Sequence, residues 1–265
     1  MDREIIQKIK DADMVLVGIG EEFEEQRYLR AVDGYDSAFA YLKENQMEWA
    51  GPALKRALLQ EDGQSLSMAF EALNNLIKEK NYFILTTVSN DMIWESSLNA
   101  ERIVAPCGGS RWKQCPEGCP EGLTEITSYE WEVLKGQLLE LKAASGEQKE
   151  PQNMQFDLGL GCCPACGKPY VLNNIYCEHY NENSYLPQWQ LYTKWLQGTL
   201  NRKLCVLELG AGMRFPNIIR WPFEKAAYFN QKASFIRVNE NLYQLSEELG
   251  EKGISVPQNA VDLLL

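Results

Sequence analysis

The segment Met14-Val-Leu-Val-Gly-Ile-Gly20 carries the strongest fold signal in this chain of 265 residues. An apolar run that ends in Gly-x-Gly is typical of a buried parallel strand that enters a tight turn. Similar apolar runs, separated by helical stretches, follow at residues 82–88, 203–210 and 234–239. Strands that alternate with helices predict an α/β fold, with a Rossmann-like, doubly wound parallel sheet.

The remaining elements follow from periodicity and from helix breakers. Helices are predicted over residues 21–30, as a series over 36–80, and over 187–200, 216–230 and 260–265, with short strands at 102–105 and 254–256. Gly51-Pro52 and Gly63 mark breaks within the series. The side chains of Trp189, Tyr192 and Trp195 share one helical face, which predicts packing against the core.

Two cysteine pairs stand in the middle of the chain, Cys115-Pro-Glu-Gly-Cys119 and Cys163-Pro-Ala-Cys166, and Cys162 adjoins the second. Four thiolates in two close pairs suit a tetrahedral zinc ion. The second pair has the spacing and the following glycine of a zinc knuckle, and the first is slightly looser. We therefore predict a structural zinc site, because four sulfur ligands leave no open position for a catalytic water. Free buried cysteines are the alternative.

The periodicity changes between about residues 107 and 180. This predicts an inserted zinc-binding module at 107–180 within a nucleotide-binding domain made of 1–106 and 181–265. No stretch approaches the roughly 20 apolar residues that span a membrane, and the N-terminus carries charges at once, so we expect a cytoplasmic protein. In that compartment, eight cysteines favour metal binding or free thiols over disulfides.

The formal net charge is −11. An acidic surface repels phosphate backbones, so we expect no nucleic-acid partner. The acidity either attracts a basic partner or simply keeps the surface solvated.

Polar or glycine-bearing residues follow four of the predicted strands. Ligands of open α/β sheets bind at the carboxyl ends of the strands, and Gly-x-Gly lets the backbone approach a phosphate. The four ends are Gly18-Ile19-Gly20, residues 86–91, Gly210-Ala211-Gly212 and Asn239. One feature opposes phosphate binding, because four glutamates follow Gly20 within residues 21–25. Arg27 or Arg214 could offset their charge.

The order of these features resembles the sirtuins, the Sir2 family of NAD-dependent protein deacylases and ADP-ribosyltransferases. The resemblance implies a large Rossmann-like domain, a small zinc module, and NAD bound between them. It also implies which residues contact the cofactor: Gly18, Ile19, Gly20, Thr87, Ser89, Gly210, Ala211, Gly212 and Asn239. Zinc would be held by Cys115, Cys119, Cys163 and Cys166.

The departures from the family are equally specific. The family's Gly-Ile-Pro-Asp-Phe-Arg cofactor loop is absent, and its Asn-x-Asp pair has become Val88-Ser89-Asn90-Asp91. The family's catalytic histidine lies eight residues before the first zinc cysteine, and Cys107 occupies that position here. The single histidine, His179, is predicted to be a surface residue, with a capping donor or a remote catalytic group as alternatives.

Residues 207–224 look like the class M, macrodomain-linked microbial sirtuins, which lack the usual histidine and include protein ADP-ribosyltransferases. The resemblance predicts NAD-dependent transfer of ADP-ribose to an acceptor protein. Asn90 and Asp91 would stabilise the oxocarbenium-like state, and Cys107 would serve as a weak acid–base or only fill space. A catalytically silent module that binds NAD, ADP-ribose or a partner protein is the alternative. Deacylation is less favoured because the general base is missing.

Overall fold

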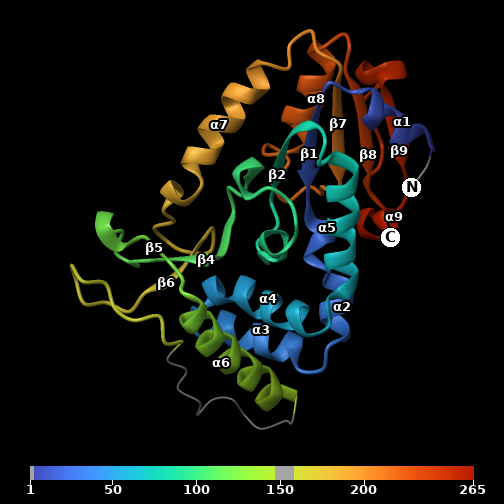
Figure 1. Ribbon diagram of the computed structural model, residues 1–265. Coiled ribbons are helices and arrows are strands. Elements are labelled where there is room, and N and C mark those ends of the chain that lie inside the picture. The colour runs from blue at the N-terminus through green and yellow to red at the C-terminus, as the bar shows by residue number, and fades with distance from the viewer. Residues whose placement is uncertain (1–2, 147–157) are drawn as a thin grey trace.

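A computed structural model describes residues 3–146 and 158–265 (Figure 1). Its central sheet has six strands, all parallel, in the order β3-β2-β1-β7-β8-β9. The strands are β1 (Met14–Ile19), β2 (Asn81–Thr86), β3 (Ile103–Val104), β7 (Leu204–Leu209), β8 (Ser234–Val238) and β9 (Gly253–Val256). The predicted doubly wound parallel sheet is confirmed. Its order reverses between β1 and β7, and such switch points are where α/β sheets bind ligands.

Helices cover both faces of this sheet. Side chains alternate between the faces of a strand, so Val15 and Val17 pack on one side while Met14 and Leu16 pack on the other. The first side is covered by α1 (Arg3–Asp11), α5 (Gln64–Ile77) and α9 (Ala260–Leu264), and the second by α7 (Leu186–Gln197) and α8 (Arg220–Phe229). Tyr192 on α7 is buried and its predicted aromatic face packs against the core.

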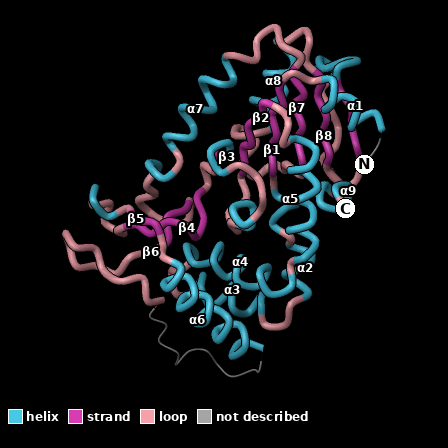
Figure 2. The backbone as a smooth tube through the Cα atoms, in the orientation of Figure 1, coloured by secondary structure: helices cyan, strands magenta, loops and turns pink. Residues whose placement is uncertain are grey.

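A second, antiparallel sheet has the order β5-β4-β6. Its strands are β4 (Gly108–Gln114), β5 (Thr124–Glu125) and β6 (Val171–Asn174). The long helix α6 (Ser128–Gly146) follows β5 and packs against α3 (Tyr35–Glu44) and α4 (Gly51–Asp62). Figures 1 and 2 show this sheet and α6 at the end of the molecule away from both termini.

The structure differs from the sequence prediction in three places. The helix predicted over 21–30 is a 3-10 turn, η1 (Glu21–Glu24), followed by α2 (Gln26–Ala31), because Glu25 takes a left-handed conformation with φ 50°. Helix α8 starts at Arg220 rather than at residue 216. The first helix, α1, was not predicted. Part of the predicted insert, residues 147–157, lies outside the described residues.

Short 3-10 turns connect several of these elements. They are η2 (Glu48–Ala50), η3 (Met92–Glu95), η4 (Ala100–Arg102), η5 (Pro120–Gly122), η7 (Glu182–Ser184) and η8 (Glu247–Lys252). Within the described part of the chain, every helix is too short or too polar to cross a bilayer.

Candidate functional site

The four predicted zinc cysteines come together at one point. Their sulfur atoms all lie within 4.8 Å of one another, and the Sγ atoms of Cys115 and Cys166 are 3.4 Å apart. Ligands at about 2.3 Å from a tetrahedral zinc are about 3.8 Å from each other, so this cluster has the right size. Cys162 is exposed and lies outside the cluster, so Cys163 is the cysteine of the two that is placed to bind a metal ion.

Tight turns build this thiolate cluster. Gly118 and Gly167 have positive φ angles of 69° and 73°, a conformation that glycine adopts without strain. Their amides donate to the carbonyls of Cys115 and Cys163, at 3.1 and 2.8 Å. The chain can therefore fold back after the first cysteine of each pair. Four convergent thiols in such turns fit a structural zinc ion.

The loops that follow β1 and β7 touch at the switch point of the large sheet. A Cβ atom on Gly20 would lie 2.3 Å from the Cα atom of Ala211, and the Gly20 amide donates to the Leu209 carbonyl at 2.9 Å. Gly18 lies inside β1, where a Cβ would meet the side chains of Ile219 and Phe223. The glycines that were predicted to admit a phosphate therefore serve close packing between chain segments.

Two glutamates of η1 occupy the backbone donors at this sheet edge. The Glu21 carboxylate accepts from the Arg214 amide at 2.7 Å and lies against Gly212. The Glu22 carboxylate accepts from the amides of Glu240 and Ala260, at 2.8 and 2.7 Å. Both carboxylates thus lie beside the glycine turn after β7, where the sequence predicted an anion.

Burial raises the pKa of Glu22 to about 7, although the Ala260 amide and Arg27 favour the ionised form. The folded chain therefore holds this proton more tightly than the unfolded chain, whose glutamates titrate near about 4.3. We expect the stability of the wild type, relative to Glu22→Gln, to fall as the pH rises from about 4.3 to about 7. Unfolding midpoints in urea across this range measure the difference. Glu251→Gln, at an exposed position, is the control for removal of a surface carboxyl group. A Glu22→Gln profile parallel to that of the wild type would contradict the expectation.

The third glutamate of η1, Glu24, is buried beneath the loop after β2. Its Oε2 atom lies 2.5 Å from the Nζ atom of Lys55, and its Oε1 atom accepts from the amide and hydroxyl of Ser89, at 3.0 and 3.4 Å. Asn90 is fully buried; its Nδ2 atom donates to the Phe23 carbonyl at 2.8 Å, and its Oδ1 atom accepts from the Met92 amide. Ser89 and Asn90 therefore fasten η1 to the loop after β2.

Asp91 connects the two sheets. It has a φ of 59°, and its Oδ2 atom accepts from both the amide and the hydroxyl of Ser110 on β4, the latter at 2.8 Å. A Cβ atom on Gly109 would lie 2.3 Å from this carboxylate, so only glycine fits there. Burial raises the pKa of Asp91, and Arg56 opposes that rise.

Cys107, at the position of the family's histidine, is 1% exposed. Burial raises the pKa of its thiol to about 12, with a further rise from Glu24 and an opposing effect of Arg214. The thiol is therefore protonated at neutral pH and cannot act as a general base. Arg214 lies nearby, where its guanidinium contacts the Tyr176 hydroxyl.

The other predicted cofactor residues take part in hydrogen bonds with backbone groups of the protein. Asn239 accepts from the amides of Asn241 and Leu242 and donates to the Ala211 carbonyl at 3.3 Å. The Thr87 amide donates to the Ile19 carbonyl at 3.1 Å. His179 is exposed. Sequence reasoning missed Lys55 and Tyr176, because neither stands in a motif.

Two cavities border this region. One of about 280 Å³ lies beside Gly210, Gly212 and Asn239, and its acidic lining is Glu21, Glu22, Glu25, Glu240 and Asp262. The other, of about 320 Å³, lies between the two sheets and is called the interlobe cleft here. Its wall includes Ile103 and Ala105 at β3, Gly108 and Gly109 on β4, and the aromatic residues Trp94, Trp112 and Tyr185.

Comparisons with known proteins point in one direction. No family model matches the chain. A curated protein of Staphylococcus aureus strain Mu50, named Protein ADP-ribosyltransferase, is 21% identical over 203 residues, which is 76% of this chain. The chain spans 60% of the length of that relative.

Solved structures show the same fold over the full length. A Sir2 homologue in complex with NAD is 13% identical, with a TM-score of 0.53 over 100% of this chain and 91% of that one. A mutant Sir2 homologue with ADP-ribose is 12% identical, with a TM-score of 0.54 over 100% and 94%. Sir2Tm bound to a propionylated peptide is 9% identical, with a TM-score of 0.54 over 99% and 94%.

A six-stranded parallel sheet in Rossmann order, joined to a module with a four-cysteine cluster, defines a Rossmann-like protein with a second lobe whose cysteines could hold a metal ion. Together with the structural neighbours, these features make the chain a divergent sirtuin-fold protein.

Proposed function

We propose that this chain is a catalytically silent sirtuin-fold binding protein that holds an extended segment of a partner protein in the interlobe cleft. The observation that carries the proposal is the position of Glu21 and Glu22, whose carboxylates already accept from three backbone amides beside the sheet edge. A pyrophosphate needs such amides free, and here acidic side chains already accept from them. Glu21 and Glu22 therefore disfavour binding of the NAD phosphates at this sheet edge.

The buried groups beneath this edge support the same proposal. The Glu24–Lys55 pair and the amide of Asn90 are engaged with protein atoms, and none of these residues lines either cavity. Cys107 is buried and protonated, so it offers no base at neutral pH. A turnover mechanism would require these contacts to open.

The interlobe cleft suits an extended chain. Strand β3 is the edge of the six-stranded sheet, so one side of its backbone has no neighbouring strand among the described residues. Ile103 and Ala105 bring this edge to the cleft, which three aromatic side chains also line. A peptide could add to the edge strand through its backbone and bury alternate side chains. The neighbour Sir2Tm, whose structure contains a propionylated peptide, supports this class of ligand.

Titration with NAD tests whether Glu21 and Glu22 keep the cofactor from the sheet edge. We expect no saturable heat and no thermal stabilisation of the wild type at millimolar NAD or ADP-ribose. A ligand at a hundred times its Kd would stabilise the fold by about 2.7 kcal/mol, which a thermal scan detects. A NAD-binding Sir2 homologue in the same assay is the positive control. Saturable binding of NAD to this chain would overturn the proposal.

Selection of peptides from a displayed random library on the intact protein tests the cleft. We expect Trp112→Ala to weaken the selected peptides at least tenfold, because this side chain lines the cleft. Trp221→Ala is the matched control, since Trp221 is 52% exposed on α8 and outside the cleft. Failure to select any peptide, or equal binding by both variants, would refute the cleft as the binding site.

NAD-dependent transfer of ADP-ribose to a protein is the second candidate. The name of the Staphylococcus aureus relative and the NAD and ADP-ribose held by Sir2 neighbours favour it. Incubation with labelled NAD and candidate acceptor proteins separates the two functions. Label on an acceptor, absent when the chain is omitted, would favour the transferase.

A further inference from the structure

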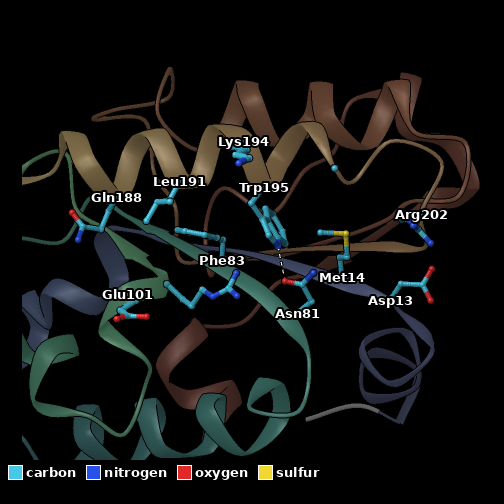
Figure 3. A pocket seen from close by; sticks show the side chains of 12 residues that line it. Asp13, Met14, Asn81, Phe83, Glu101, Gln188, Leu191, Lys194, Trp195 and Arg202 are labelled. Atoms are coloured by element: carbon cyan, nitrogen blue, oxygen red, sulfur yellow. Dashed lines mark hydrogen bonds between the residues drawn. The ribbon is translucent and has the colours of Figure 1, made fainter.

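A cavity of about 870 Å³ lies under α7, far from the carboxyl ends of the strands. Its floor includes Met14 and Asn81, the first residues of β1 and β2, and Leu191, Lys194 and Trp195 come from α7 above (Figure 3). It is larger than the interlobe cleft and the acidic cavity. Its volume falls within the range of small-molecule sites.

The centre of this cavity is apolar and held in place. The rings of Phe83 and Trp195 are 5.6 Å apart, and the Trp195 indole donates to the Asn81 side chain at 2.8 Å. Met14 and Phe83 are 7% and 2% exposed, so they form a fixed floor. Trp195 is half-buried, and the buried Phe83 ring packs against it, so the fixed indole offers an exposed surface on which a flat ligand can stack.

Three basic side chains, Arg102, Lys194 and Arg202, line the same cavity. None of them belongs to an ion pair within residues 3–146 and 158–265. The chain has 37 acidic and 26 basic residues, so there are enough carboxylates for every basic group to have an acidic partner. Three basic groups without such a partner in one cavity are therefore unexpected.

Two carboxylates, Asp13 and Glu101, line the cavity together with the three cations, which leaves one cation in excess. Asp13 accepts from the Lys203 amide at 3.1 Å, and Figure 3 shows Asp13 near Arg202 and Glu101 at the opposite end of the cavity. The Arg102 guanidinium lies 5.6 Å from the centre of the Phe83 ring, which places positive charge directly beside the aromatic floor.

We propose that the cavity under α7 binds an organic anion with a flat apolar body, such as an aryl carboxylate, sulfonate or phosphate. The body lies against Trp195 and Leu191, and the cations that line the cavity, Lys194 and Arg202 among them, attract the anionic group. This site is separate from the interlobe cleft and does not depend on the function proposed for it.

Binding of 1-anilinonaphthalene-8-sulfonate to the full chain tests the proposal, with the neutral N-phenyl-1-naphthylamine as its matched probe. We expect one sulfonate site per chain, with at least tenfold tighter binding than the neutral probe. Lys194→Ala with Arg202→Ala should weaken the sulfonate at least tenfold and leave the neutral probe unchanged. Both cations are exposed, so the fold tolerates these changes.

Control variants separate this cavity from other apolar surface. Leu191→Asp places a carboxylate at a 53% exposed position in the cavity and should abolish binding of the sulfonate. Leu200→Asp, at a 64% exposed position outside the cavity, should have no effect. Trp221→Ala tests the exposed aromatic residues of α8, which could also attract the probe. Sulfonate binding that survives Leu191→Asp, is lost in Trp221→Ala, or does not exceed that of the neutral probe would overturn the proposal.

Discussion

Replacing Cys163 with serine should remove the bound metal and unfold the module around it. The four sulfurs converge within 4.8 Å, and Cys115 and Cys163 are each 1% exposed within the main core. In zinc-finger peptides, binding of a structural zinc contributes about 10–16 kcal/mol to folding. A typical domain is stable by only about 5–15 kcal/mol, so losing one of four ligands is a large change. Elemental analysis of wild type purified without chelators should give one zinc per chain.

Cys162→Ser is the matched control for this experiment. Cys162 adjoins Cys163 in the sequence, but it is exposed and its sulfur is outside the cluster. We expect this control to keep its zinc and its resistance to proteolysis, while Cys163→Ser loses zinc and becomes cleavable within residues 107–180. Equal zinc content in the two variants, or a wild type free of zinc, would argue against a metal at the cluster.

The strands and the cysteine cluster could be predicted because their signals are local. The buried parallel strands β1, β2, β7 and β8 lie at mostly apolar runs of the sequence, which Glu208 in β7 and Arg237 in β8 interrupt. The zinc cysteines have a spacing that few other arrangements explain. The extent of helix 21–30 was harder to predict, since the left-handed Glu25 that interrupts it has no sequence signal of the kind that glycine provides.

The chemistry of the strand ends could be predicted only in part. Four glutamates after Gly20 indicated that a pyrophosphate would be repelled, but the sequence gives no sign of which groups they contact. Glu22 bonds the amide of Ala260, which is 238 positions away in the chain. Partners at such separations are set by the topology of the sheet, because β1, β8 and the segment after β9 meet at one edge.

Asn90 and Asp91 also show that position in a motif does not by itself predict what a side chain contacts. Family position predicted that they would stabilise the oxocarbenium-like state, and in the structure both are hydrogen-bonded to protein atoms. A motif fixes where a residue stands along the chain, whereas burial and hydrogen bonding decide which groups are free for a ligand. Their catalytic role therefore stays a prediction, which the NAD titration addresses.

Glu24→Gln should destabilise the fold by about 3–5 kcal/mol, the usual cost of leaving a buried charge without its partner. The Glu24 and Lys55 side chains are each 6% exposed, and their charged atoms lie 2.5 Å apart. Glutamine has nearly the same shape and can still accept from Ser89, so the change isolates the charge. Urea unfolding of the wild type and the variant measures the difference.

A double-mutant cycle distinguishes loss of the ion pair from loss of packing. Lys55→Met should be as costly as Glu24→Gln, because the carboxylate is then the unpaired charge, whereas the double variant should recover most of the stability. Glu125→Gln, which breaks an exposed pair with Arg111, should cost less than about 1 kcal/mol. If Glu24→Gln were no more costly than Glu125→Gln, the pair would not hold η1 against the loop after β2. The contacts of Glu21 and Glu22 at the sheet edge would then lose one of their supports, since these residues belong to the same turn as Glu24.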